Sequence, residues 1–266
     1  MTAAIQLQKI GYAYGREPVL NAISISIARG DYFIIIGPNG SGKTTLLKLA
    51  AGIIRTTGGD VRIQGRSIGR FSRRHLARAI AYVPQLIRTD FPFTVMEVVL
   101  MGRSPHLGML GFEQPRDIAL AREAMGFTGV DHLAHRKLNA LSGGECQRVF
   151  IARAICQESE IMLLDEPTAS LDLAHQVRVM DLMEQLRIEK GITVVMVSHD
   201  VNLAAMYGNR ILLLNKGRIA GTGTPRQVIT YQTLEAVYGC KVLVDLSPLG
   251  DFPRVTLVPS RYIPAG

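Results

Sequence analysis

The sequence predicts an α/β protein with a mainly parallel central sheet, an antiparallel β-rich start and an inserted helical segment. Continuous apolar runs at 32–36 and 161–164 are typical of parallel strands buried on both faces. Residues 5–10 and 22–27 instead alternate polar and apolar side chains, as half-buried antiparallel strands do. From 94 to 157 the apolar residues recur at helical spacing, which predicts the helical insert.

The composition fits one large α/β domain, or two small ones, with a substantial core. The chain has 266 residues, of which 47% are hydrophobic and 20% charged, and these are ordinary values for a folded protein. No apolar run approaches the roughly 18 residues that span a bilayer. The first ten residues lack the charged start and apolar core of a secretory signal. We therefore expect a soluble cytoplasmic protein.

The cysteines and the net charge give weaker indications. Cys146, Cys156 and Cys240 form no CxxC pair, so we expect reduced thiols and no zinc site. The net charge of +8 is compatible with nucleic acid or an anionic membrane surface as a partner. We favour a solvated helix face for the densest basic group, which comprises Arg66, Arg70, Arg73, Arg74 and Arg78.

Turn signals divide the first part of the chain. Gly30-Asp31 precedes the buried strand at 32–36, and Gly58-Gly59-Asp60 is expected to form a turn. A strand at 61–63 then closes at Gln64-Gly65, and a further short strand is expected to end at 83–85.

The second part alternates strands with a helix. A crossover helix is expected at 174–187, between the strand at 161–164 and another at 192–197. A strand at 211–214 precedes a turn at Lys216-Gly217. Beyond residue 241, the apolar segments 242–244 and 255–258 predict a small hairpin whose function the sequence does not indicate.

The glycine-rich stretch GPNGSGKTT follows the strand at 32–36 and leads into a helix. This strand, loop and helix context is that of a phosphate-binding loop, although glycine loops also form plain turns. Backbone N–H groups and the helix N-terminus would bind the anion, while the lysine contacts the β- and γ-phosphates and the first threonine binds Mg²⁺. The stretch comprises Gly37, Pro38, Asn39, Gly40, Ser41, Gly42, Lys43, Thr44 and Thr45.

Polar residues follow two of the expected central strands. Asp165 ends the first strand and fits the position of a magnesium-binding aspartate. Glu166 could orient or deprotonate a water aimed at the γ-phosphate. His199 ends the next strand and could reach the same phosphate, although a lone histidine is usually structural.

A second candidate anion site begins a later helix, at Leu141–Arg148. Ser142, Gly143 and Gly144 precede an apolar helix, so the serine hydroxyl and free N–H groups could bind phosphate or could simply cap the helix. If both anion sites bind one nucleotide from opposite sides, a second copy of the chain is required, because the helical insert separates them.

These motifs together resemble the nucleotide-binding subunit of ATP-binding cassette transporters over residues 3–240. The match to a phosphate loop is GPNGSGKT, and LSGGE at 141–145 resembles the family's signature sequence. IMLLDE at 161–166 resembles its magnesium strand with the catalytic glutamate, and SLD at 170–172 resembles its D-loop. Gln85 matches the Q-loop glutamine, His199 the switch histidine, and Tyr14 the aromatic residue that stacks on adenine.

The resemblance implies a role for each of these positions, with ATP and Mg²⁺ as cofactors. The catalytic residues it implies are Glu166, His199, Gln85 and Lys43. The magnesium-binding residues it implies are Thr44, Gln85 and Asp165. Outside the phosphate loop, the nucleotide-binding residues it implies are Tyr14, Ser142, Gly143, Gly144, Glu145 and Asp172.

The resemblance also implies an assembly. It gives a P-loop NTPase core at 1–240, with a helical subdomain inserted at about 86–158 and a short extension at 241–266. Two copies form a head-to-tail homodimer around two ATPs and act on two transmembrane permease subunits, indirectly with a substrate-binding protein. We expect a peripheral position on the cytoplasmic face of the inner membrane and no nucleic acid.

The segment TVMEVVLMGRSPH at 94–106 resembles importers of iron chelates, haem and cobalamin. The alternative, which we favour less, is that the segment serves only for packing. The GTP at 223–225 and the strand-rich tail are also similar. The alternative function is a soluble cassette ATPase acting on nucleic acid or ribosomes, suggested by the net charge. A small-molecule kinase is a third possibility, but it gives no reason for Leu141–Gly144. The sequence does not reveal which chelate is moved.

Overall fold

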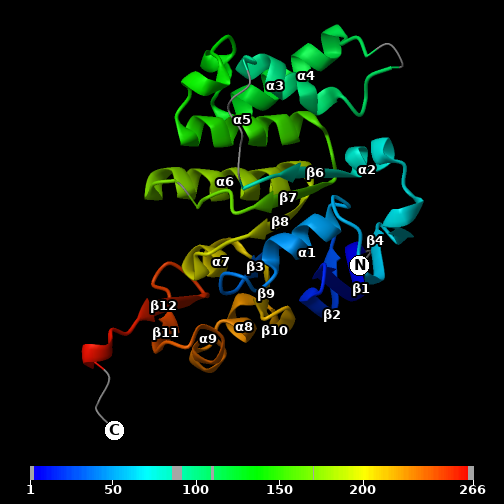
Figure 1. The fold of residues 1–266 in the computed structure, drawn as a ribbon. Coiled ribbons are helices and arrows are strands. Elements are labelled where there is room, and N and C mark those ends of the chain that lie inside the picture. Colours follow the sequence, from blue (N-terminus) through cyan, green and yellow to red (C-terminus); the bar gives the residue numbers. More distant parts are fainter. Residues whose placement is uncertain (1–2, 86–91, 109–110, 170, 263–266) are drawn as a thin grey trace.

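The computed structural model describes residues 3–85, 92–108, 111–169 and 171–262. They form a six-stranded sheet, a four-stranded sheet, a separate layer of helices and a C-terminal hairpin (Figure 1). The larger sheet has the order β10-β9-β3-β8-β7-β6 and is parallel except at β10. Its strands are β3 (Tyr32–Ile36), β6 (Ile80–Val83), β7 (Ile161–Asp165), β8 (Thr193–Val197), β9 (Arg210–Asn215) and β10 (Arg218–Gly223). The predicted parallel central sheet is therefore confirmed.

The four-stranded sheet is antiparallel and has the order β2-β1-β4-β5. Its strands are β1 (Ala3–Tyr14), β2 (Glu17–Ala28), β4 (Gly58–Ile63) and β5 (Arg66–Ser67). The turn expected at Gly58-Gly59-Asp60 is wrong, because these residues begin β4 and pair with β1. Gly59 has a φ of +86°, and an added Cβ would lie 2.3 Å from the Gln8 carbonyl oxygen. These glycines therefore allow a close strand approach rather than a reversal.

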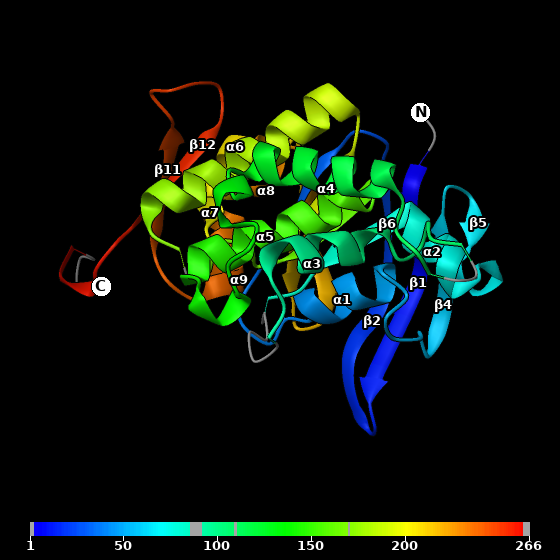
Figure 2. The same ribbon diagram turned by 90° about the horizontal axis from the view of Figure 1, so that it is seen from above.

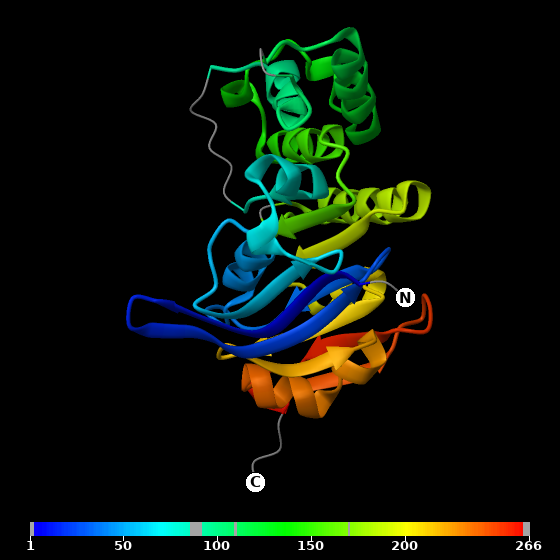
Figure 3. The same ribbon diagram turned by 90° about the vertical axis from the view of Figure 1, so that its right-hand side faces the viewer.

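Helix α1 (Lys43–Ala50) lies between the two sheets (Figures 1 and 3). Its residues Leu46 and Leu49 share one apolar core with Ile5 of β1 and with Phe33 and Ile35 of β3. The alternate β3 side chains, such as that of Ile34, belong to the core on the opposite sheet face. Both faces of β3 are therefore buried, which fixes the loop that joins it to α1.

The second core holds the helices that cover the other face of the large sheet. They include the predicted crossover helix, which the structure gives as α6, and α7, which follows β8. Outside the separate helical layer, the helices other than α1 are α2 (Arg73–Ala79), α6 (Leu173–Lys190), α7 (Val201–Tyr207), α8 (Pro225–Val228) and α9 (Tyr231–Tyr238). Short 3₁₀ turns occur at Ile68–Arg70, Met101–Arg103, Asp131–Leu133, Leu138–Ala140 and Ser260–Tyr262.

The predicted helical segment forms its own layer, with α3 (Val95–Leu100), α4 (Pro115–Thr128) and α5 (Gly143–Cys156) packed together (Figure 1). Residues 86–91, where the subdomain was expected to begin, lie outside the described residues. A buried Arg103 holds this layer together, because its guanidinium donates to Asp117 of α4 at 2.9 Å and to the Cys156 carbonyl of α5 at 2.8 Å.

Helix α2 connects the helical layer to the large sheet. The five arginines that were expected on a solvated face are exposed, and Arg74 and Arg78 also donate to the Pro105 carbonyl. From the other side, the Gln157 amide donates to the Ile80 carbonyl at 2.7 Å. Two of the basic side chains therefore anchor the layer.

The C-terminal extension contains two antiparallel strands, β11 (Val242–Leu246) and β12 (Pro253–Leu257). They lie beside α7 in Figures 1 and 2. Among the described residues, no helix combines the length and apolar character needed to cross a bilayer.

Candidate functional site

The loop between β3 and α1 depends on glycine at its first position. Gly37 has a φ of +147°, and an added Cβ would lie 2.1 Å from the Leu214 carbonyl oxygen of β9. Gly42, at φ +101°, is the N-cap residue of α1 and has no side chain to occupy the helix start. The first N–H groups of α1 therefore remain available to an anion, and the helix dipole favours that anion.

The Lys43 side chain curls back over this loop. Its Nζ donates to the carbonyl oxygens of Gly37 and Pro38, both at 2.9 Å. Burial lowers the pKa of Lys43, while the nearby carboxylates of Glu166 and Asp165 oppose that shift. Lys43 carries the only formal positive charge in the loop, and neutral carbonyl oxygens of the same loop hold its ammonium group in place.

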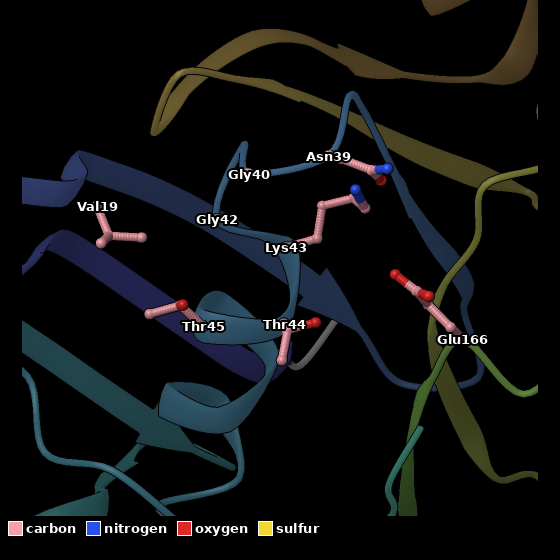
Figure 4. A pocket seen from close by; sticks show the side chains of 8 residues that line it. All are labelled: Val19, Asn39, Gly40, Gly42, Lys43, Thr44, Thr45 and Glu166. Atoms are coloured by element: carbon pink, nitrogen blue, oxygen red, sulfur yellow. The ribbon is translucent and has the colours of Figure 1, made fainter. Parts of the chain in front are cut away.

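A pocket of about 290 Å³ opens beside the loop (Figure 4). Glu166 faces Lys43 and Thr44 across it. Six of the predicted loop residues line the pocket, whereas Gly37, Pro38 and Ser41 do not. The Ser41 carbonyl instead accepts from the Gly217 N–H at 3.1 Å. The lining residues are Val19, Asn39, Gly40, Gly42, Lys43, Thr44, Thr45 and Glu166.

Oxygen atoms gather where β7 ends. The Thr44 hydroxyl donates to Asp165 Oδ1 at 2.9 Å, and the Tyr82 hydroxyl donates to Asp165 Oδ2 at 3.1 Å. Asp165 is buried, and burial together with this carboxylate raises the pKa of Tyr82. A carboxylate and a hydroxyl are ligands that suit a hard cation such as Mg²⁺, so the residues present fit that ion.

Glu166 connects three elements at the pocket wall. It follows β7 with a left-handed φ of +52°, a conformation that is uncommon for a residue with a Cβ. Its carboxylate accepts a hydrogen bond from the Gln85 amide, and its Oε1 lies 2.5 Å from His199 Nε2. The glutamate is 8% exposed and the histidine 42%. The structure therefore brings together the predicted Gln85, Glu166 and His199.

The second candidate anion site begins α5, in the helical layer and away from the phosphate loop of the same chain (Figures 1 and 3). Ser142 Oγ accepts from Glu145 N–H, and Glu145 Oε2 accepts from Ser142 N–H at 2.7 Å. This capping box holds the helix start, and the Ser142 N–H lowers the pKa of Glu145. The serine hydroxyl therefore caps the helix in this chain.

Gly144 places the start of α5 against the start of α6. An added Cβ would contact His175 and Leu171 at 3.5 Å. Asp172 caps α6, because its Oδ1 accepts from the His175 N–H at 2.9 Å and contacts His175 Nδ1 at 2.7 Å. Ser170, which belongs to the same predicted motif, lies outside the described residues.

Tyr14 lies apart from the pocket lining. It ends β1, is 52% exposed, and makes an edge contact with the Tyr12 ring at a centroid distance of 4.9 Å. Val19 and Tyr82 are site residues that the sequence reasoning missed. Tyr82 could have been suspected only from the strand order, because β6 neighbours β7 in the sheet.

Comparisons with known proteins agree on one family. The family model described as ABC transporter matches residues 20–169. The ferric enterobactin transport ATP-binding protein FepC of Escherichia coli (strain K12) is 35% identical over 95% of this chain and 93% of its own length. The hemin import ATP-binding protein HmuV of Gloeobacter violaceus is 42% identical over 92% and 91%.

Solved structures agree with this assignment. A metal-chelate type ABC transporter in an inward-facing conformation has a TM-score of 0.87 and 30% identity, covering 99% of this chain and 100% of that one. The ATP-binding cassette MJ0796, solved as a dimer in a post-hydrolysis state with ADP and Pi, has a TM-score of 0.72 and 30% identity, covering 83% and 98%. This chain belongs to the ABC transporter family and is one of its ATPase cassettes.

Proposed function

We propose that this chain is the ATP-hydrolysing subunit that powers import of a metal chelate through a permease dimer, by ATP-driven closure of two cassettes. The observation that carries the proposal is the position of Glu166, which contacts Gln85 and His199 and faces the phosphate loop across one pocket. Such a carboxylate suits the activation of a water at the terminal phosphate.

In this proposal the phosphate loop, Gly37 to Thr45, binds the β- and γ-phosphates, and Tyr14 stacks on the adenine. Lys43 exchanges its carbonyl acceptors for phosphate oxygens, which are charged and bind an ammonium more strongly. Thr44, Asp165 and Gln85 would hold Mg²⁺, which when bound neutralises charge on the phosphates.

Glu166 and His199 then have different roles in the hydrolysis of ATP. Glu166 orients the attacking water and accepts its proton, and the Gln85 amide holds the carboxylate in place. The His199 N–H that now meets Glu166 turns to the γ-phosphate and stabilises the charge that develops there.

The second half of each site comes from another copy of the chain. Ser142, Gly143, Gly144 and Glu145 begin α5 on a layer that lies away from the phosphate loop, so one chain does not complete a site alone. We propose that they and Asp172 approach the ATP that is bound to the partner copy. The dimeric MJ0796 cassette supports this arrangement.

The proposed partners are two transmembrane permease subunits and, indirectly, a substrate-binding protein, with the cassettes on the cytoplasmic face of the membrane. The printed names of FepC and HmuV refer to ferric enterobactin and hemin, which supports a metal chelate as the cargo. We expect no nucleic-acid partner, because Arg74 and Arg78 on α2 already donate to backbone carbonyls.

A reconstitution experiment tests the proposal. The chain is purified together with the membrane subunits that copurify with it and placed in liposomes, and ATP-dependent uptake of ferric siderophore, haem and cobalamin is measured. We expect uptake of one of them, and loss of uptake with Lys43→Ala. ATP-independent uptake, phosphate transfer to a small acceptor, or a cassette that stays monomeric with a slowly hydrolysed ATP analogue would contradict the proposal.

A further inference from the structure

The C-terminal hairpin is packed onto the catalytic core. Val242 is buried, and Val244, Phe252 and Val255 pack against the core cluster that also contains Leu203 and other residues of α7. Figures 1 and 2 both place β12 beside α7. The hairpin therefore forms part of the support of the helix that follows β8.

One side chain joins this hairpin to α7 by two hydrogen bonds. Asn202 Oδ1 accepts from the Val255 N–H at 2.8 Å, and Asn202 Nδ2 donates to the Val255 carbonyl at 3.1 Å. The carboxamide thus pairs with both backbone groups of one β12 residue, as a neighbouring strand would. A carboxamide can make this pair because its acceptor oxygen and its donor nitrogen are bonded to the same carbon.

Asn202 is three residues from His199, and the intervening chain is held tightly. Asp200 caps α7 and accepts from the N–H groups of Asn202 and Leu203 at 2.8 and 2.9 Å. The Asp200 N–H donates to Ser198 Oγ at 3.1 Å. A displacement of Asn202 would therefore move the segment that carries the imidazole facing Glu166.

The same C-terminal part also touches the phosphate loop. Tyr238, the last residue of α9, is packed against the core; burial raises the pKa of its hydroxyl to about 12, and the nearby Gly37 backbone opposes that rise. This second contact lies at the start of the loop rather than at its pocket lining. Residues 231–257 thus lie near the site at two places, beside α7 and near the start of the phosphate loop.

We infer that Asn202 is a positioning residue for His199, and that the hairpin β11–β12 holds, through Asn202, the segment that carries this histidine beside the pocket. This inference rests on the proposed hydrolytic role of Glu166 and His199. It gives residues 241–257 a part in the rate of ATP hydrolysis, while nucleotide binding is left to the phosphate loop. A misplaced catalytic group lowers turnover more than it lowers substrate affinity.

The test uses the full chain with Asn202→Asp. The aspartate keeps the size and the acceptor for the Val255 N–H, and it is favourable in the first turn of a helix, but its second oxygen opposes the Val255 carbonyl. We expect kcat for ATP hydrolysis to fall roughly tenfold, with KM for ATP changed by less than about twofold. Amide exchange at 254–257 should become faster.

Two comparisons make the result specific. In a His199→Ala background, Asn202→Asp should cause no further fall in kcat, because it acts through a histidine that is absent. The matched control is Thr256→Ala, an exposed neighbour of Val255 on β12, which should keep the wild-type kcat.

The inference fails if Asn202→Asp leaves kcat or the amide exchange of 254–257 unchanged, or if its effect on kcat persists without His199. It also fails if KM and melting temperature change together with kcat, because the pair would then be structural only. A wild-type chain that releases no phosphate from ATP would instead overturn the proposed function, before any variant is compared.

Discussion

His199 Nε2 lies 2.5 Å from Glu166 Oε1, and the two residues come from the ends of neighbouring strands β8 and β7. The parallel register of these strands, in which Asp165 pairs with Val197, brings the following residues to one edge of the sheet. The edge also carries the phosphate loop after β3. Sheet topology therefore assembles the proposed catalytic group.

Replacing Glu166 by glutamine should separate hydrolysis from binding. Glu166→Gln keeps the side-chain shape and removes the proposed base, so phosphate release from ATP should fall by roughly 10² or more. ATP affinity, measured by equilibrium titration, should be retained. Glu189→Gln on α6, an exposed residue outside the pocket lining, serves as control, and turnover near wild type in Glu166→Gln would remove the glutamate from this role.

Ser142 should matter to dimer closure beyond its function as a cap. Ser142→Asp retains a good capping residue, but it places a carboxylate where we propose that the partner's phosphates bind. We expect the melting temperature to change little and ATP-dependent dimerisation, followed by light scattering, to be lost. Ser72→Asp at the N-cap of α2 is the matched control; loss of dimerisation in both variants, or in neither, would argue against a specific role.

Tyr82 should act on Mg²⁺ through Asp165. Tyr82→Phe removes the hydroxyl that donates to Asp165 Oδ2. Loss of a group that orients a metal ligand typically weakens metal binding by 10–100-fold, so the Mg²⁺ concentration for half-maximal hydrolysis should rise roughly tenfold. Tyr207→Phe, which loses a hydroxyl bound to Asp181, is the control. Identical magnesium titrations of the two variants would count against the prediction.

Asp117 should make the helical layer sensitive to acid. The Gln114 N–H, and after it the Arg103 guanidinium, lower the pKa of Asp117 below its ordinary value. A carboxyl group with a lowered pKa in the folded state contributes stability above its ordinary pKa, and that contribution is lost as pH falls towards the folded-state value. Asp117→Asn should therefore flatten the dependence of unfolding free energy on pH between about 5 and 3.

The same variant leaves the buried Arg103 charge with one carboxylate fewer. It should cost about 3 kcal/mol of unfolding free energy near neutral pH, as breaking a buried ion pair does. Denaturant titrations at several pH values measure both effects. Asp131→Asn, an exposed site in the same layer, should change neither, and a parallel pH profile for Asp117→Asn and wild type would contradict the assignment.

The sequence predicted the parts of the fold that are set by local pattern. The buried strands, the loop Gly37–Thr45 and the helical segment follow from apolar periodicity and glycine spacing. The assignment of Gly58–Asp60 to a turn was wrong because two adjacent glycines favour a reversal by themselves. Only the register with β1 reveals that they permit a close strand approach.

The contacts of the site were less predictable because they join residues far apart in sequence. Nothing near Tyr82 indicates that its hydroxyl meets Asp165, since this follows from strand order. The pair Asn202 with Val255 spans 53 positions and depends on where the hairpin packs. The motifs whose residues were predicted to act on the nucleotide could thus be recognised in the sequence, whereas the residues that orient those motifs could not.

An added Cβ at Gly144 would contact Leu171 and His175 at 3.5 Å, so no side chain at this position separates the start of α5 from the start of α6. If Ser142 of one copy contacts the ATP of the other, a shift of Ser142 would be passed to Asp172, which we propose approaches that same ATP. Release of phosphate from the ATP would then displace both helix starts together, and the two elements would leave the partner copy as one unit.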